Sequence, residues 1–60
     1  MERRIWHPDE NRWIILDRDG SLIDIQRTGS GRLSFHASSN DFEPREIESW
    51  MRAEGHLPPA

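Results

Sequence analysis

The sequence predicts an α+β fold: a small antiparallel sheet of three to four strands in meander order, with one C-terminal helix packed on one face. Residues 12–17 and 32–37 have the β-branched, aromatic or alternating pattern of strands, and residues 44–54 have the apolar spacing of an amphipathic helix. A sheet with one apolar face needs a covering layer, and the helix supplies it. We expect one domain over residues 1–55 and a short C-terminal tail over residues 56–60.

The composition limits how this fold is stabilised. The chain has 60 residues, and a domain of this size buries only about 60% of the surface that its unfolded chain exposes. It contains no cysteine, which excludes disulfides and thiolate metal sites. Three tryptophans increase the area that a few side chains bury. Stability is therefore expected from a tightly packed core or from self-association.

The charge balance bears on partners. The formal net charge is −3, from 8 basic and 11 acidic residues. Proteins that bind nucleic acid normally carry a basic surface, so this balance disfavours them, although a local basic patch is compatible with it. No stretch approaches the ~20 apolar residues of a membrane span, and the N-terminus leads into no apolar signal segment. We expect a cytoplasmic protein without membrane partner or cofactor.

Residues 3–17 contain β-branched and aromatic residues that are typical of strands. Ile5 and Trp6 lie within residues 3–7, which are compatible with a short fourth strand. Residues 8–11 combine proline, aspartate and asparagine, as turns do. Residues 12–17 (RWIILD) have the strongest strand pattern of the chain.

The turn after this strand fixes the strand pairing. Residues 17–20 (DRDG) fit a type I turn followed by a glycine bulge, with glycine where φ must be positive. Asp17 then pairs with Ser21. A shift by one residue would divide the apolar side chains that share one face of the sheet between its two faces, so this register is favoured. It makes four pairs: Trp13 with Ile25, Ile15 with Ile23, Leu16 with Leu22 and Ile14 with Asp24.

A second hairpin and the helix complete the expected fold. Residues 28–31 (TGSG) form a turn, and the strand after it adds Leu33 and Phe35 to the apolar face. Residues 38–41 (SSND) offer helix N-caps, and Pro44 fits the first helical turn. The helix ends at a glycine, and its apolar stripe consists of Ile47, Trp50 and Met51.

Residues 13–24 (WIILDRDGSLID) resemble the first motif of the haloacid-dehalogenase-like phosphohydrolases, an apolar strand followed by Asp-x-Asp-Gly-Thr/Ser-Leu-x-Asp. The resemblance implies a parallel sheet, Asp17 as nucleophile, Asp19 as general acid/base and Mg²⁺ at the phosphate. It covers 12 of 60 residues, and the 36 residues after Asp24 contain no lysine and too little chain for crossover helices. A hairpin turn explains the same residues, so we expect no enzyme and no catalytic residue.

Metal binding is not expected either. The aspartates of the DRDG turn supply too few oxygens for a calcium site. The three histidines are far apart in the sequence and have no metal-ligand spacing. We expect them at the surface or at the edge of the sheet.

The reverse face of the sheet is the candidate binding site. Ile14, Leu16 and Leu22 point away from the helix in the predicted register, and Trp6 extends the set if its segment pairs beside them. Contiguous apolar patches on small proteins tend to mark interfaces. Two explanations stay open: a partner, either another protein or a second copy, covers these residues, or the N-terminal segment folds over them.

We therefore expect a small non-enzymatic protein-binding module, such as an inhibitor or adaptor that blocks its target sterically or electrostatically through this face and its acidic rim. A homodimer is one form of this expectation. The alternative is a nucleic-acid-binding accessory or regulatory protein that uses a sheet face bearing Arg12, Arg27 and Arg32. In architecture, though not in sequence, the expected fold resembles the DNA-reading arm-binding domains of some integrases.

Overall fold

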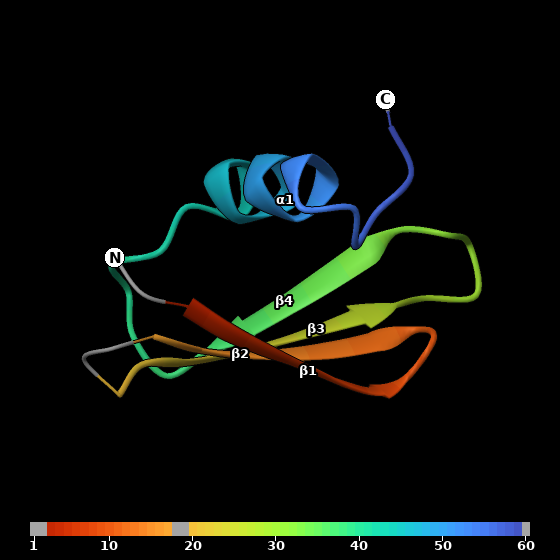
Figure 1. Cartoon of the computed structure of the whole chain (residues 1–60). Coiled ribbons are helices and arrows are strands. Elements are labelled where there is room, and N and C mark those ends of the chain that lie inside the picture. Colours follow the sequence, from red (N-terminus) through yellow and green to blue (C-terminus); the bar gives the residue numbers. More distant parts are fainter. Residues whose placement is uncertain (1–2, 18–19, 60) are drawn as a thin grey trace.

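The computed structural model describes residues 3–17 and 20–59 (Figure 1). Four antiparallel strands form one sheet in the order β1-β2-β3-β4, each beside its neighbour in the sequence. The element bounds are β1 Arg3–Asp9, β2 Arg12–Asp17, β3 Leu22–Arg27, β4 Leu33–Ala37 and α1 Pro44–Ala53. The helix lies over one face of the sheet, and no other described element lies over the opposite face (Figure 1). The predicted α+β meander is confirmed.

The N-terminal segment is a strand, and it is longer than residues 3–7. β1 continues through Pro8 and Asp9, which were predicted to lie in a turn. Proline is tolerated there because β1 is an edge strand, and the pairing register shifts between Trp6 and Asp9. The shortened turn is closed by a hydrogen bond of 2.8 Å from the Asn11 N–H to Asp9 Oδ1.

The hairpin between β2 and β3 has the predicted geometry. Gly20 has a φ of +89°, and its N–H donates to the Asp17 carbonyl at 3.0 Å. The Asp17 N–H donates to the Ser21 carbonyl, also at 3.0 Å. The other two loop residues of the prediction, Arg18 and Asp19, lie outside the described residues. The four predicted pairs are confirmed: Trp13 with Ile25, Ile15 with Ile23, Leu16 with Leu22 and Ile14 with Asp24.

The core lies between the inner face of the sheet and α1. Its buried side chains are Trp13, Ile15, Ile23, Ile25, Ile47, Met51 and Leu57. Leu33, Phe35 and Trp50 are half-buried and pack against it. A fully buried aliphatic side chain contributes ~1.5–3 kcal/mol relative to an exposed one, so this small set must supply most of the stability.

The helix begins differently from the prediction. Its N-cap is Glu43, which has an extended backbone and makes no side-chain capping hydrogen bond. The predicted caps, residues 38–41, lie too far upstream, and Ser39 Oγ instead accepts a hydrogen bond from the Asp41 N–H at 3.1 Å. Pro44 explains the difference, because its ring presets a helical φ and it has no N–H that needs a cap.

The helix ends at the predicted glycine. Gly55 has a φ of +82°, its N–H donates to the Arg52 carbonyl at 3.1 Å, and the His56 N–H donates to the Met51 carbonyl at 2.8 Å. These two bonds form a Schellman motif. The motif turns the chain back toward the sheet, where Leu57 is only 5% exposed. The segment predicted as a tail therefore supplies a core residue.

Candidate functional site

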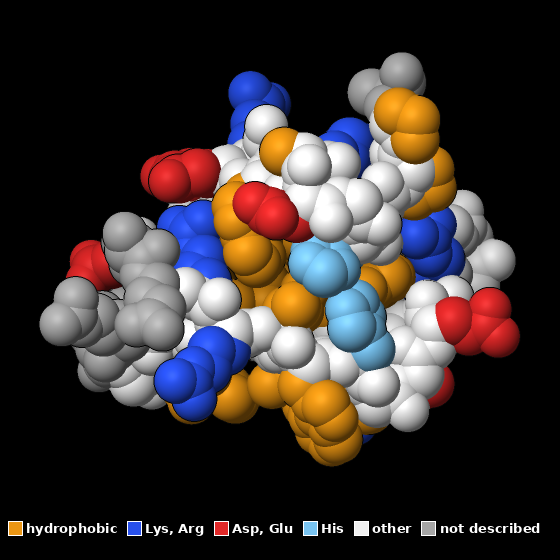
Figure 2. All heavy atoms as spheres, in the orientation of Figure 1, with side chains coloured by type: hydrophobic (Ala, Val, Ile, Leu, Met, Phe, Trp, Pro, Cys, Tyr) orange, Lys and Arg blue, Asp and Glu red, His pale blue; other side chains and the backbone are white. Residues whose placement is uncertain are grey.

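Four apolar residues lie on the face of the sheet that faces away from α1, which we call the outer face. Three of them are the exposed large hydrophobic residues of the described chain: Trp6 at 62%, Leu16 at 46% and Leu22 at 43%. Ile14 is half-buried between them. Hydrophobic side chains are visible on this side of the sheet in Figure 2, along the lower margin. We call Trp6, Ile14, Leu16 and Leu22 the outer patch.

Strand register makes the outer patch continuous. Trp6 lies directly opposite Ile14, and Leu16 lies directly opposite Leu22. Residues opposite each other have Cβ atoms about 4.5–5.5 Å apart, and Ile14 and Leu16 are alternate residues of β2. The structure thus brings together all four residues of the predicted binding face. Their role in binding stays a prediction.

The N-terminal segment does not cover this patch. Residues 3–9 form β1 and pair with β2 in the plane of the sheet. Trp6 joins the patch from β1, so the segment enlarges the apolar surface. Of the two explanations left open by the sequence, the described residues therefore exclude intramolecular cover by this segment.

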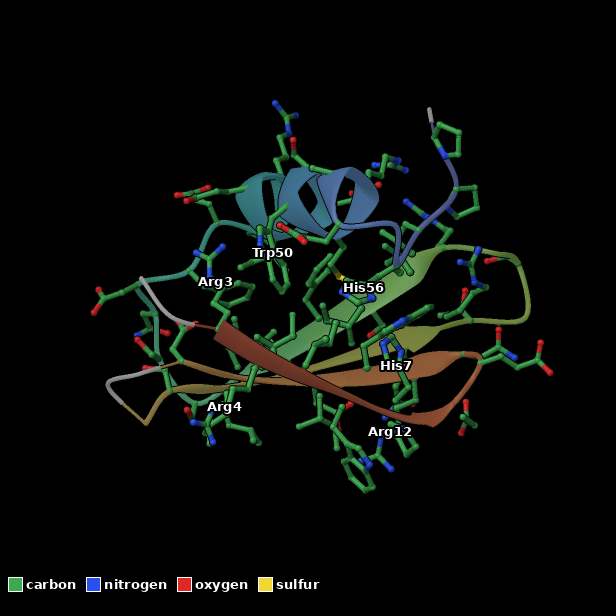
Figure 3. All side chains as sticks on the ribbon, viewed as in Figure 1. Arg3, Arg4, His7, Arg12, Trp50 and His56 are labelled. Carbon is green, nitrogen blue, oxygen red and sulfur yellow. The ribbon has the colours of Figure 1, made fainter. Side chains whose placement is uncertain are left out.

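Charged residues of both signs border the patch. Arg4 lies opposite Leu16 and is exposed, and Arg12 and Asp24 form an ion pair on the same face. Arg4 and Arg12 lie on the side of the sheet away from the helix, whereas Arg3 lies on the helix side (Figure 3). The border formed by the described residues is therefore mixed and not acidic.

The Arg12–Asp24 pair has two-point geometry. Arg12 Nη2 donates to Asp24 Oδ2 at 2.9 Å, and Nε donates to Oδ1 at 3.2 Å. The hydrogen bonds from Arg12 lower the pKa of Asp24 most, and Gln26 and His36 act in the same direction against the opposing effect of partial burial. The same hydrogen bonds raise the pKa of Arg12. The pair stays ionised at neutral pH and holds two side chains of adjacent strands together.

The three arginines of the nucleic-acid alternative do not share one surface. Arg12 is on the outer face and is paired with Asp24. Arg27 lies on the inner side, with its guanidinium carbon 5.7 Å from the ring centroid of the buried Trp13. Arg27 and Arg32 instead line a groove beside α1, together with Arg52. The sequence suggests Arg52 as part of a basic surface but does not place it beside Arg27 and Arg32, because no short-range pattern links the helix to the loop that precedes β4.

The fold implied by the phosphohydrolase resemblance is not present, because β2 and β3 are antiparallel and joined by a tight hairpin. Asp17 pairs with Arg3, whose Nε lies 3.3 Å from Asp17 Oδ1, although neither atom has hydrogen-bond geometry. Arg3 also lies 3.7 Å from Glu46 and 5.4 Å from the Trp50 ring centroid. Within the described chain, Asp17 therefore takes part in a cluster that joins β1, β2 and α1.

Two histidines meet between the sheet and the C-terminal segment. The ring centroids of His7 and His56 are 5.0 Å apart, and the Trp50 ring lies 5.9 Å from that of His56 (Figure 3). Figure 2 shows two histidine side chains together on this side of the molecule. Their separation in sequence concealed the contact. Across residues 3–17 and 20–59, no three His, Cys, Asp or Glu side chains are placed to hold a metal ion.

The described residues contain no helix with the length and apolar character needed to cross a membrane. Comparison with models of protein families, with curated proteins and with solved structures finds no match for this chain.

Proposed function

We propose that this chain is a small non-enzymatic protein-binding module whose outer patch docks on an apolar surface of a partner protein. The observation that supports this most is the exposure of three large apolar side chains, Trp6, Leu16 and Leu22, on adjacent strands. Burial of apolar surface is favourable by roughly 25 cal/mol per Å². A partner that covers the patch is stabilised in the complex by this free energy of burial. Tryptophan is among the residues most enriched at the energetic centres of interfaces.

The surroundings of the patch fit the same function. Interfaces commonly have an apolar centre and a polar border. Here the border includes Arg4, which has no carboxylate partner among the described residues, and the mutually neutralised Arg12–Asp24 pair. We infer a partner surface that is apolar at its centre and carries an acidic group near Arg4. A chain that binds in this way acts as an inhibitor or adaptor by covering the surface of its target.

Site-specific crosslinking tests the proposal. A photoreactive phenylalanine analogue replaces Leu22 in one variant and Ser49, an exposed residue of α1, in a matched control. We expect a discrete protein adduct from position 22 and not from position 49. Adding Leu16→Glu to the first variant should abolish the adduct, because it places a charge at the centre of the patch. Equal adducts from both positions, or an adduct that resists Leu16→Glu, would contradict the proposal.

Salt dependence separates this function from the nucleic-acid alternative. Binding that neutralises phosphates weakens steeply as the salt concentration rises. Docking of an apolar patch should change little between 50 and 500 mM NaCl. Arg12 and Arg27 lie on opposite faces of the sheet and so do not form one basic surface, which favours the protein-binding proposal. Steeply salt-dependent binding to an oligonucleotide would favour the alternative.

A further inference from the structure

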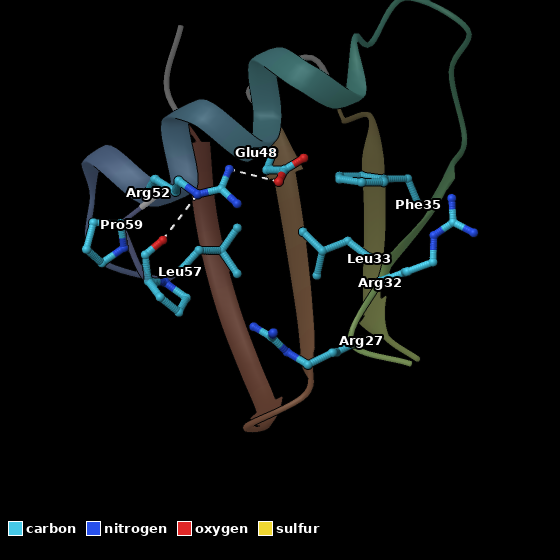
Figure 4. Close-up of a pocket in the computed structure, with 10 residues that line it drawn as sticks. Arg27, Arg32, Leu33, Phe35, Glu48, Arg52, Leu57 and Pro59 are labelled. Carbon is cyan, nitrogen blue, oxygen red and sulfur yellow. Dashed lines mark hydrogen bonds and ion pairs between the residues drawn. The ribbon is translucent and has the colours of Figure 1, made fainter. Parts of the chain in front are cut away.

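A groove lies between β4 and the layer formed by α1 and the C-terminal segment. Its volume is about 390 Å³. Leu33 and Phe35 line it from β4, Glu48 and Arg52 from α1, and Leu57 from the segment after the helix (Figure 4). Three consecutive segments of the C-terminal half therefore build this groove. It lies on the helix side of the sheet, away from the outer patch.

The groove carries excess positive charge. Arg27, Arg32 and Arg52 all line it. Arg52 is neutralised by Glu48, at 2.8 Å, and also donates a hydrogen bond to the Pro58 carbonyl at 3.1 Å (Figure 4). Arg27 and Arg32 have no carboxylate partner among residues 3–17 and 20–59. Two guanidinium groups without a carboxylate partner among the described residues thus line this groove, in a chain whose net charge is −3.

Arg27 is held in place without an anion. Its guanidinium carbon lies 5.7 Å from the ring centroid of Trp13, within the range of a cation–π interaction. Trp13 is only 3% exposed and is fixed in the core. A guanidinium that is positioned in advance loses little conformational freedom on binding, and its planar donors match a carboxylate.

No described strand pairs with β4 on the side away from β3. The Thr28 N–H donates to the Arg32 carbonyl at 2.7 Å, and the Ser38 N–H donates to the Leu22 carbonyl at 2.9 Å, which marks hydrogen-bonded pairs at both ends of the β3–β4 ladder. Such pairs alternate with non-bonded pairs along antiparallel strands. The β4 residues of the non-bonded pairs therefore direct their N–H and C=O groups away from β3, to the open edge. These residues are Leu33, Phe35 and Ala37.

The two edges of the sheet differ in their capacity to accept a strand. β1 contains Pro8, which has no N–H, and its register shifts between Trp6 and Asp9. β4 contains no proline, and it pairs with β3 through five consecutive positions without a shift. Proline and bulges are devices that block edge pairing. β4 is therefore the open edge of the two.

We propose that the β4 edge and this groove bind an extended peptide segment of a partner protein that carries carboxylates on both sides of an apolar residue. The peptide backbone pairs with β4, as in strand addition. Side chains of paired strands share a face, so alternate peptide residues point into the groove beside Leu33 and Phe35. The apolar side chain contacts these two residues and Leu57, and the carboxylates meet Arg27 and Arg32. This second surface goes beyond the function proposed above, because it does not use the outer patch.

A blocked six-residue peptide with glutamate, leucine and glutamate at alternate positions and threonine between them is the probe. It is titrated into the ¹⁵N-labelled full chain and followed by NMR. We expect saturable binding with the largest amide shift changes at Leu33, Phe35 and Ala37. Kd should rise at least tenfold for Arg27→Gln and for Arg32→Gln. Arg45→Gln, which neutralises an exposed arginine at the other end of α1, should leave Kd unchanged.

Two matched peptides separate the contribution of the carboxylates to binding from that of the peptide backbone. A peptide with lysine in place of glutamate should not bind, because it lacks the carboxylates. A peptide N-methylated at every second residue should lose binding if the backbone pairs with β4. If Arg27→Gln disturbs packing on Trp13, Arg32→Gln still tests whether the peptide carboxylates bind an arginine, because the Arg32 side chain is exposed. No binding of the acidic peptide, equal binding of the lysine peptide, or tighter binding of a thymidine oligonucleotide would overturn the proposal.

Discussion

Leu16 of β2 lies directly opposite Leu22 of β3, and each side chain keeps more than two fifths of its surface exposed. The pair forms the centre of the outer patch. Because the same patch on a second copy is apolar too, a symmetric contact between two copies is possible without any other partner. We expect sedimentation velocity at micromolar concentration to show a dimer or a larger species.

Leu16→Glu should shift this species to a monomer, with at least a tenfold increase in the dissociation constant, because dimerisation would bury the new charge. Ser49→Glu adds the same charge to the exposed surface of α1 and should leave the distribution unchanged. A monomer at every concentration would refute self-association and would leave a different protein as the partner of the outer patch.

The Arg12–Asp24 pair predicts a specific acid dependence of stability. The pKa of Asp24 is lowered in the folded state, first by its hydrogen bonds with Arg12, relative to about 3.9 in an unfolded chain. A lowered folded-state pKa gives a contribution that is complete above the unfolded-state value and is lost as the pH falls through the folded-state value. Asp24→Asn should therefore reduce the free energy of unfolding at pH 7, with a difference from wild type that shrinks as the pH falls below the unfolded-state value of about 3.9.

Urea titrations of both proteins at pH 7, 5, 4 and 3 measure this difference. Asp41→Asn is a suitable control, because Asp41 is exposed and forms no ion pair among the described residues. Since Arg12 and Asp24 are partly exposed, 1 M NaCl should weaken the Asp24→Asn effect. A difference that persists unchanged at pH 3 would show that Asp24 acts through packing and not through its charge.

Leu57 should be essential for stability although it lies outside the predicted domain. It is 5% exposed and belongs to the core, so Leu57→Ala removes buried apolar volume. Such substitutions cost about 2–5 kcal/mol, and a site near the C-terminus should fall near 2. Pro59→Ala changes an exposed neighbour and should have an effect within about 0.5 kcal/mol. Thermal unfolding by circular dichroism compares the two, and equal stabilities would mean that Leu57 does not pack as described.

Gly55, which ends the helix, should tolerate a side chain less well than Gly29 of the β3–β4 loop. Its φ of +82° places it in the left-handed region, where a side chain costs about 1–2 kcal/mol. Gly55→Ala should therefore lower stability by about 1 kcal/mol even though no atom lies within 4 Å of the added Cβ. Gly29→Ala meets no atom either and requires no left-handed φ, so it should be neutral or slightly stabilising. Chemical denaturation of both variants tests the contrast, which reversed signs would refute.

The β2–β3 hairpin shows why part of this fold is predictable from sequence. Its turn residues and the alternation on both sides act within about ten residues, and together they fix one register. The apolar stripe of α1 and the glycine that ends the helix are likewise set by residues close together in the sequence. The outer patch was predictable because it is the reverse side of that register, and side chains alternate strictly along strands.

The sequence by itself determined the order of the elements, the central register and the four residues of the outer patch. Only the tertiary structure decided that β1 extends through Pro8 as an edge, that Leu57 returns to the core and that His7 contacts His56. It also decided that Arg27 lies beside the helix and apart from Arg12. The His7–His56 contact joins segments at opposite ends of the chain, and Leu57 reaches the core from the segment after the helix. Both depend on the angle at which the helix lies across the sheet. No periodicity or turn motif encodes that angle, so no short window of sequence contains it.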